Sequence, residues 1–375
     1  MKTDYENTEI FSMDIDDCVD VITREQVIKC SESTPYRSQE ILAESSIDVH
    51  QRFAICAADI GDRNLPEEED DYLSRFEVDK DRILLSAAFR RLARKTQVFA
   101  FPGDHQRNRL THAIEVSQIA SRIAKAIGLN VHLTEAIALG HDIGHGPGGH
   151  AAEDAFSQFI PNYFYHGSFG ADVVLAPMNL CRQTLDGIRN HSWSRPIPAT
   201  REALVVSFAD RIAYCTHDLE DAMQIGLVQK KLFPRFVMSV IGETKETQVN
   251  ALSREIIFCF KNYSLIGMRR QYWDALCEFR KFNFEFIYNS PEVEKTNRLF
   301  VALDTALVEF FLTHTAMLPQ ESAVNDVAAV SSTEQDVLKQ SINFVATMTD
   351  DYALRLGREL LDFEIPEPRY LQACH

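Results

Sequence analysis

Apolar residues follow a helical period through most of the chain. Over residues 110–127 they recur every three or four positions, which is the spacing of a helix with one buried face. Gly128 follows at once and is placed to end that helix. A second helix is predicted over 133–142, with Thr134 as its cap. It stops before the glycines and proline of 144–149, which do not continue a helix comfortably.

A third strong helix is predicted over 201–225. It is mostly apolar but carries a polar stripe at helical offsets, made of Asp210, Tyr214, His217, Asp218 and Asp221. The helical period continues through 229–364, for example over 269–288 and 302–314. Because internal repeats are missing and β-type alternation is rare, the pattern predicts an all-α architecture.

The chain divides into three parts by this pattern. Residues 1–72 form an N-terminal extension that mixes short apolar and polar pieces and ends in the acidic run 67–71 after Pro66. We expect that run to be solvated, because a block of like charge repels itself. Residues 73–228 form the helical core, and residues 229–375 form a C-terminal helical region that packs on it.

The composition and charge of the chain exclude several classes of protein. The chain has 375 residues, of which 45% are apolar and 25% charged, enough for a large buried core. A formal charge of −17 argues against broad binding of nucleic acid or anionic membrane. The eight cysteines have no CxxC pair, and no signal sequence or uncharged apolar run of about eighteen residues occurs. We therefore expect a soluble protein of the reducing cytoplasm without a membrane partner.

Four side chains of metal-ligand type stand on the three strong helices: His112, the adjacent pair His141 and Asp142, and Asp210. A single histidine on an apolar helix is more often a hydrogen-bonded core residue than a ligand. Two neighbours at the end of a helix, however, can both reach one ion, whereas neighbours in mid-helix diverge. Buried carboxylates are costly without a counter-charge. The pattern predicts one divalent cation with open positions for water and a phosphate oxygen, which is a hydrolytic site.

Several sequence blocks resemble one known family. They are DRILLSAAFRRLARKTQVF (81–99), RLTHAIEV (109–116), GHDIGHGPGGHAAED (140–154), ADRIAYCTHDLEDA (209–222) and, near the end, FVATMTDDYAL (344–354). Together they resemble the HD-domain deoxynucleoside triphosphate triphosphohydrolases, the dGTPase-like group. The resemblance covers 74–227 well and 341–354 partially. It implies an HD-domain helical bundle with additional C-terminal helices.

The resemblance also implies roles for individual residues. His112, His141, Asp142 and Asp210 match the four metal ligands of the family. His145, His150, Glu153 and His166 match positions that hold the attacking water and the phosphates or handle protons. The spacing of His150 and Glu153 on a glycine-rich turn independently suits a carboxylate that orients an imidazole.

An anionic substrate needs concentrated positive charge on this acidic chain. Arg109, one turn before His112, and Arg211, beside Asp210, match phosphate-contacting positions of the family. Gln97 resembles a glutamine that touches the nucleoside, and Tyr214 and Asp218 match residues that line the sugar. Arg90, Arg91, Arg94 and Lys95 crowd the preceding helix, where surface solubilisation is the alternative explanation.

The chain departs from the family pattern at three places. Many relatives have an aromatic residue where this chain has Gly148, which predicts a looser loop. Gly167 follows His166 where the family generally has Asn or Glu. Asp351 stands where an arginine is common.

The resemblance implies hydrolysis of deoxynucleoside triphosphates to deoxynucleoside and tripolyphosphate with one divalent ion, for which Mn²⁺, Fe²⁺, Co²⁺, Ni²⁺ and Mg²⁺ all suit the ligands. In this prediction His150, oriented by Glu153, protonates the departing 5′-oxygen. A homo-oligomer is implied as well.

Two alternatives stay open. One is an HD hydrolase of another nucleotide phosphate ester. The other is a non-catalytic regulator that binds a nucleotide, or binds single-stranded nucleic acid along 90–95. The residues do not fix a base preference.

Overall fold

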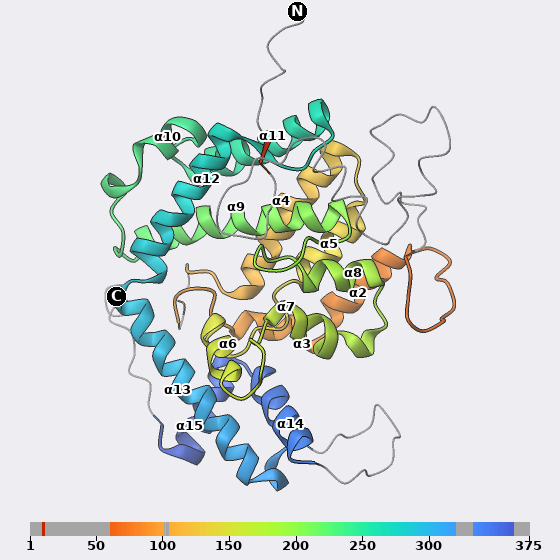
Figure 1. Cartoon of the computed structure of the whole chain (residues 1–375), viewed down its shortest axis with the longest axis vertical. Helices are drawn as coiled ribbons and strands as arrows, with labels where there is room; N and C mark the ends of the chain where they lie inside the picture. Colours follow the sequence, from red (N-terminus) through yellow and green to blue (C-terminus); the bar gives the residue numbers. More distant parts are fainter. Residues whose placement is uncertain (1–9, 12–60, 101, 103–104, 320–332, 364–375) are drawn as a thin grey trace, which may run out of the picture.

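The computed structural model describes residues 10–11, 61–100, 102, 105–319 and 333–363, and within them the fold is all-α apart from one pair of short strands (Figure 1). The α-helices are α2 (Arg75–Leu85), α3 (Ala87–Arg91), α4 (Arg109–Ile127), α5 (Val131–Gly140), α6 (His150–Ser157), α7 (His166–Phe169), α8 (Arg182–Arg189), α9 (Arg201–Gln224), α10 (Arg235–Ile241), α11 (Lys245–Tyr263), α12 (Arg270–Asn283), α13 (Pro291–Thr313), α14 (Glu334–Ala346) and α15 (Asp350–Leu361). Strands β1 (Ile10–Phe11) and β2 (Met268–Arg269) pair antiparallel.

Helices α4, α5 and α9 form the centre of the molecule and pack on one another. Helices α2 and α8 pack against α5, and α11 covers α4 and α9. One continuous apolar cluster joins these elements, with Ile123, Ile137 and Phe208 fully buried within it. In Figure 1, α10, α11 and α12 lie at one end of the molecule and α13, α14 and α15 at the other, with the central helices between them.

Capping residues set the ends of the central helices. Helix α4 begins after Asn108, whose side chain accepts a hydrogen bond from the backbone N–H of Thr111, and it ends at Gly128 with a φ of 75°. Helix α5 begins two residues earlier than the sequence pattern predicts. Asn130, not Thr134, is its cap, because the Asn130 side chain accepts from the N–H of Leu133.

The C-terminal region packs on the core through a second apolar cluster. Helix α13 lies along α6, and α14 and α15 pack on α13. Phe300, Leu307 and Val345 are buried in this cluster. Helix α13 begins eleven residues before the predicted 302–314, because Ser290 caps it and Pro291 occupies its first position. The proposed boundaries at residues 72 and 228 stay predictions.

The acidic run is exposed, but arginines anchor part of it. Glu67 pairs with Arg63 and Arg82, and Glu69 pairs with Arg75. Most of the N-terminal extension lies outside the described residues. None of the described helices combines the length and apolarity that crossing a membrane requires.

Candidate metal and phosphate site

The four predicted metal ligands converge from three helices. His112 lies in the first turn of α4, His141 and Asp142 follow the last residue of α5, and Asp210 lies in the middle of α9. His112 Nε2 is 3.0 Å from Asp210 Oδ1 and 3.9 Å from Asp142 Oδ2. His141 Nε2 is 3.4 Å from Asp142 Oδ1 and 3.8 Å from Asp210 Oδ1. Two ligands that are each about 2.1 Å from an ion lie no more than about 4.2 Å apart, so the separations suit one shared cation.

The hydrogen bond that His141 makes through Nδ1 leaves its other ring nitrogen, Nε2, available to a metal. Its Nδ1 donates to the carbonyl of Ala138 at 2.7 Å, so its Nε2 carries a lone pair. That Nε2 is buried and has no hydrogen-bond partner within the described residues. A buried, unpaired imidazole nitrogen beside two carboxylates is the donor set that a divalent ion uses. The described residues therefore contain histidine–aspartate clusters able to hold a divalent metal.

The site attracts positive charge. Burial opposes the ionised form of Asp210, but the hydrogen bond with His112 and the nearby histidines outweigh burial and lower the pKa of Asp210. Asp142 behaves likewise, with His141 and Arg109 lowering its pKa against the effect of burial. Conversely, Asp210 and Asp142 raise the pKa of His112 although burial acts in the opposite direction. Both carboxylates are therefore ionised at neutral pH.

Arg109 lies beside the predicted metal ligands. The side chain is 1% exposed, and its Nη1 donates to Asp142 Oδ2 at 2.7 Å. Its Nε and Nη2 have no hydrogen-bond partner within the described part of the chain. A buried guanidinium with free donors beside the ligand cluster is suited to an anionic oxygen.

The glycine-rich loop between α5 and α6 is tightly packed, so the predicted looser loop is wrong. A Cβ on Gly148, whose φ is +68°, would lie 2.4 Å from Cγ of Phe300 on α13. The Phe300 ring therefore fills the space beside the position where relatives carry an aromatic residue. The N–H of Gly148 also donates to Asp350 Oδ1 at 3.0 Å, and Lys95 Nζ donates to the carbonyls of His145 and Ala346.

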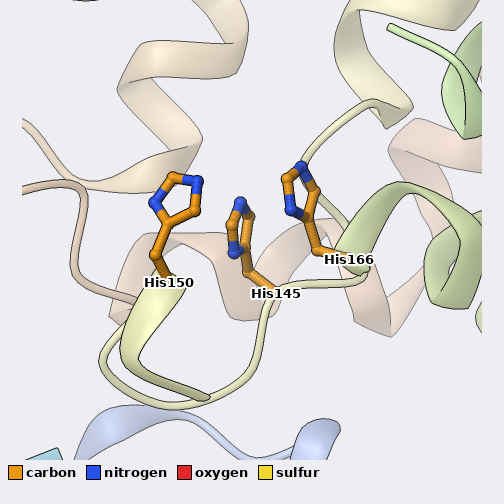
Figure 2. Close-up of side chains that lie close together, drawn as sticks. All are labelled: His145, His150 and His166. Atoms are coloured by element: carbon orange, nitrogen blue, oxygen red, sulfur yellow. The ribbon is translucent and has the colours of Figure 1, made fainter. Parts of the chain in front are cut away.

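Three histidines stand in a row (Figure 2), and Nε2 of the middle one, His145, lies 3.2 Å from Oδ1 of the candidate ligand Asp142. His145 lies between the other two, stacked on His166 with ring centroids 3.6 Å apart and edge-on to His150 at 4.8 Å. His145 is fully buried, whereas His150 is exposed. His150 is therefore the member of the row that a solute meets first.

Glu153 orients His166 rather than His150, which corrects the predicted pairing. Its Oε1 accepts from His166 Nδ1 at 2.6 Å and from the His166 backbone N–H at 2.8 Å. Burial alone would raise the pKa of Glu153, but the nearby His166 and His150 lower it to about 2. The sequence could not decide this, because two histidines were available to one carboxylate.

His191, which the sequence analysis did not single out, also lies in the cluster. Its Nε2 is 3.1 Å from His166 Nε2, and its ring centroid is 5.0 Å from that of His141. Its Nδ1 donates to the carbonyl of Ile188, and burial lowers its pKa to about 3. His191 stands alone in a non-helical segment after α8, so no spacing pattern marked it.

Family models match both halves of the chain. The HD domain matches residues 109–215, and the phosphohydrolase-associated domain matches residues 266–359. A deoxyguanosinetriphosphate triphosphohydrolase-like protein of Caldanaerobacter subterraneus is 33% identical over 341 residues, covering 89% of this chain and 98% of the relative. A like-named protein of Clostridium tetani is 36% identical, covering 78% and 87%. The chain belongs to the dGTPase-like HD phosphohydrolases.

Three of the predicted substrate-contacting residues of this HD phosphohydrolase, Arg211, Tyr214 and Asp218, lie on α9. The guanidinium of Arg211 stacks over the ring of Trp193 at 3.5 Å, and Tyr214 lies 5.6 Å from it. Asp218 accepts a hydrogen bond from the Tyr288 hydroxyl at 2.7 Å. Trp193 and Tyr288 were not predicted, because each comes from a distant segment.

Other predicted residues of the HD phosphohydrolase have different surroundings. Gln97 Oε1 is buried and has no hydrogen-bond partner among the described residues. Two residues of the polar stripe on α9 form ion pairs with neighbouring residues. His217 pairs with Glu115, and Asp221 pairs with Arg107.

The cationic cluster at 90–95 does not act as one surface. Lys95 is buried, whereas Arg90 and Arg94 are exposed. Arg94 pairs with Asp351, the residue that stands where relatives often carry arginine. Two side chains of this basic segment, those of Lys95 and Arg94, therefore already make contacts within the protein.

Proposed function

We propose that the chain hydrolyses deoxynucleoside triphosphates to deoxynucleoside and tripolyphosphate with a divalent metal. The observation that carries the proposal is the convergence of His112, His141, Asp142 and Asp210 next to the buried, partly unpaired guanidinium of Arg109. The relatives named as deoxyguanosinetriphosphate triphosphohydrolase-like proteins support the substrate class.

His112, His141, Asp142 and Asp210 would hold the ion. When bound there, a divalent ion would lower the pKa of a water ligand and polarise a phosphoryl oxygen. Arg109 would donate its free N–H groups to the triphosphate, Arg211 would neutralise charge that develops on it, and His145 would donate a hydrogen bond. Asp142 would keep Arg109 in position through their 2.7 Å hydrogen bond.

His150 would protonate the departing 5′-oxygen. The exposure of His150 in the histidine row supports this role, because a substrate would approach from solvent. Glu153 and His166 would support the row rather than transfer the proton, because Glu153 is bonded to His166. Gln97, Tyr214 and Asp218 are proposed to contact the nucleoside, with Tyr214 placed to disfavour a 2′-hydroxyl sterically.

Product analysis tests the proposal. The protein is incubated with each of the four canonical deoxynucleoside triphosphates and Mn²⁺, and nucleosides and polyphosphates are separated by chromatography. Deoxynucleoside and tripolyphosphate in equal amounts are expected. Absence of tripolyphosphate, together with hydrolysis of a nucleoside monophosphate or cyclic nucleotide, would favour an HD hydrolase of another phosphate ester. A nucleotide-induced thermal shift without product would favour a binding regulator. Oligomerisation, nucleic-acid binding and a cytoplasmic location stay predictions.

A further inference from the structure

The guanidinium of Arg211 rests on an aromatic face instead of pairing with a carboxylate. Its Cζ lies 3.5 Å from the ring centroid of Trp193, and the residue is 9% exposed. Its Nε is buried and has no hydrogen-bond partner among the described residues, and none of the ion pairs that these residues form includes Arg211. The buried guanidinium of Arg109, in contrast, pairs with Asp142. Because a buried charge without a counter-charge is costly, Arg211 is suited to an anion that a ligand supplies.

Trp193 is supported on its other face. Trp273 stacks on it with ring centroids 5.1 Å apart and planes 13° apart, and Phe208 meets it edge-on at 5.3 Å. A guanidinium and an indole that both stack this closely cannot share one face, so the Trp193 ring lies between Arg211 and Trp273. Since both of its faces are occupied, Trp193 cannot stack on a nucleobase and would act on a ligand through Arg211.

The stack lies next to the histidine–aspartate cluster. Arg211 directly follows the candidate metal ligand Asp210 in α9. Trp193 lies two residues after His191, whose ring centroid is 5.0 Å from that of His141. A guanidinium that lies over an aromatic face keeps its N–H donors in its own plane, at its edge. Donors in that arrangement can form two parallel hydrogen bonds with phosphate oxygens.

We propose that Trp193 is a positioning residue that holds the guanidinium of Arg211 edge-on toward the polyphosphate of the substrate. The inference rests on the proposed function for the identity of that anion. A carboxylate in the place of Trp193 would compete with the phosphates for the same N–H donors. An indole face attracts the cation and leaves those donors free.

Binding of inorganic tripolyphosphate tests the proposal without turnover. Calorimetric titrations of the full chain are made at a fixed concentration of Mn²⁺, and circular dichroism checks the fold of each variant. Trp193→Leu should weaken tripolyphosphate binding about tenfold, because a desolvated cation–π contact is lost. Trp193→Phe keeps a smaller ring and should weaken binding roughly threefold. This graded loss keeps the test decisive if the leucine variant does not fold.

Two further measurements separate positioning from a general disturbance of the fold. Binding of Mn²⁺ alone should be the same in the wild-type protein and in both Trp193 variants, and the KM for a deoxynucleoside triphosphate should rise more than kcat falls. Phe258→Leu is the matched control, because it removes a ring that lies 4.3 Å from the guanidinium of Arg269. It should bind tripolyphosphate as the wild-type protein does.

A double-mutant cycle shows whether Trp193 acts through Arg211. Arg211→Ala should weaken tripolyphosphate binding at least as much as Trp193→Leu, and the double variant should bind no more weakly than Arg211→Ala. Additive losses, or wild-type affinity in both Trp193 variants, would overturn the proposal.

The outcomes also separate this proposal from the proposed function. Weaker tripolyphosphate binding by Trp193→Leu, without hydrolysis of any deoxynucleoside triphosphate by the wild-type protein, would support the positioning role and disprove the reaction. Hydrolysis with the same KM in the wild-type protein and in both Trp193 variants would support the reaction and disprove the positioning role.

Discussion

Glu153 and His166 are joined twice, since one carboxylate oxygen accepts both the ring Nδ1–H and the backbone N–H of the histidine. This contact fixes the ring rotation and the tautomer of His166 together. The carboxylate therefore acts on the site through the histidine and not by touching a substrate.

Replacing Glu153 by Gln should lower the hydrolytic rate about tenfold to a hundredfold, because the imidazole of His166 loses the charged partner that orients it. The amide can still accept one hydrogen bond but removes the charge that polarises the imidazole. We expect kcat to fall more than KM rises. Asp154→Asn, at the exposed neighbour, is the matched control. Equal losses in both variants would contradict the positioning role.

Asp210→Ala should abolish metal-dependent turnover, because the oxygen that lies within 3.8 Å of both His112 Nε2 and His141 Nε2 is removed. Steady-state rates across a Mn²⁺ titration measure this, and circular dichroism checks the fold. His314→Ala should retain the wild-type rate. Turnover by Asp210→Ala at saturating Mn²⁺ would exclude this aspartate as a ligand.

Stability should depend on pH through Asp218. Burial raises the pKa of Asp218 from 3.8 to about 7, so between about pH 4 and 7 the folded chain holds a proton that the unfolded chain has lost. The free energy of unfolding should therefore decrease as pH rises through that window, by up to ~1.4 kcal/mol per pH unit from this group. Asp218→Asn should remove this contribution and keep an acceptor for the Tyr288 hydroxyl.

Urea denaturation of both proteins at several pH values measures the difference. Other titrating groups cancel in the comparison, because both proteins carry them. Parallel curves for the two proteins over this window would show that Asp218 is ionised in the folded state.

Gly148→Phe should destabilise the protein, although relatives carry an aromatic residue there. The Phe300 ring already occupies the space, and overpacking costs about 1–3 kcal/mol. In a Phe300→Ala background the same change should cost less, leaving mainly the penalty for a side chain at positive φ. A double-mutant cycle from urea denaturation measures the coupling. Additive effects would mean that the two positions do not compete for space.

The helices, and the meeting of two candidate ligands at the end of one of them, could be predicted because their signals are local. The three-or-four spacing over 110–127 and the cap signals gave α4 to within one residue, and the adjacency of His141 and Asp142 at a helix end placed two ligands together. The partner of Glu153, the position of His191 and the contact between Gly148 and Phe300 depend instead on how separate segments meet. Periodicity and spacing do not carry that information.

Asp350, the first residue of α15, accepts hydrogen bonds from the Thr96 hydroxyl and backbone N–H as well as from the Gly148 N–H. This one carboxylate thus holds in place the turn between two histidines proposed to act on the phosphates and the proton, His145 and His150. Shortening the chain before α14 would release that turn, so an excised HD segment should lose catalytic competence even where its own helices persist. The phosphohydrolase-associated region is, in this sense, a structural part of the reaction centre rather than an appendage to it.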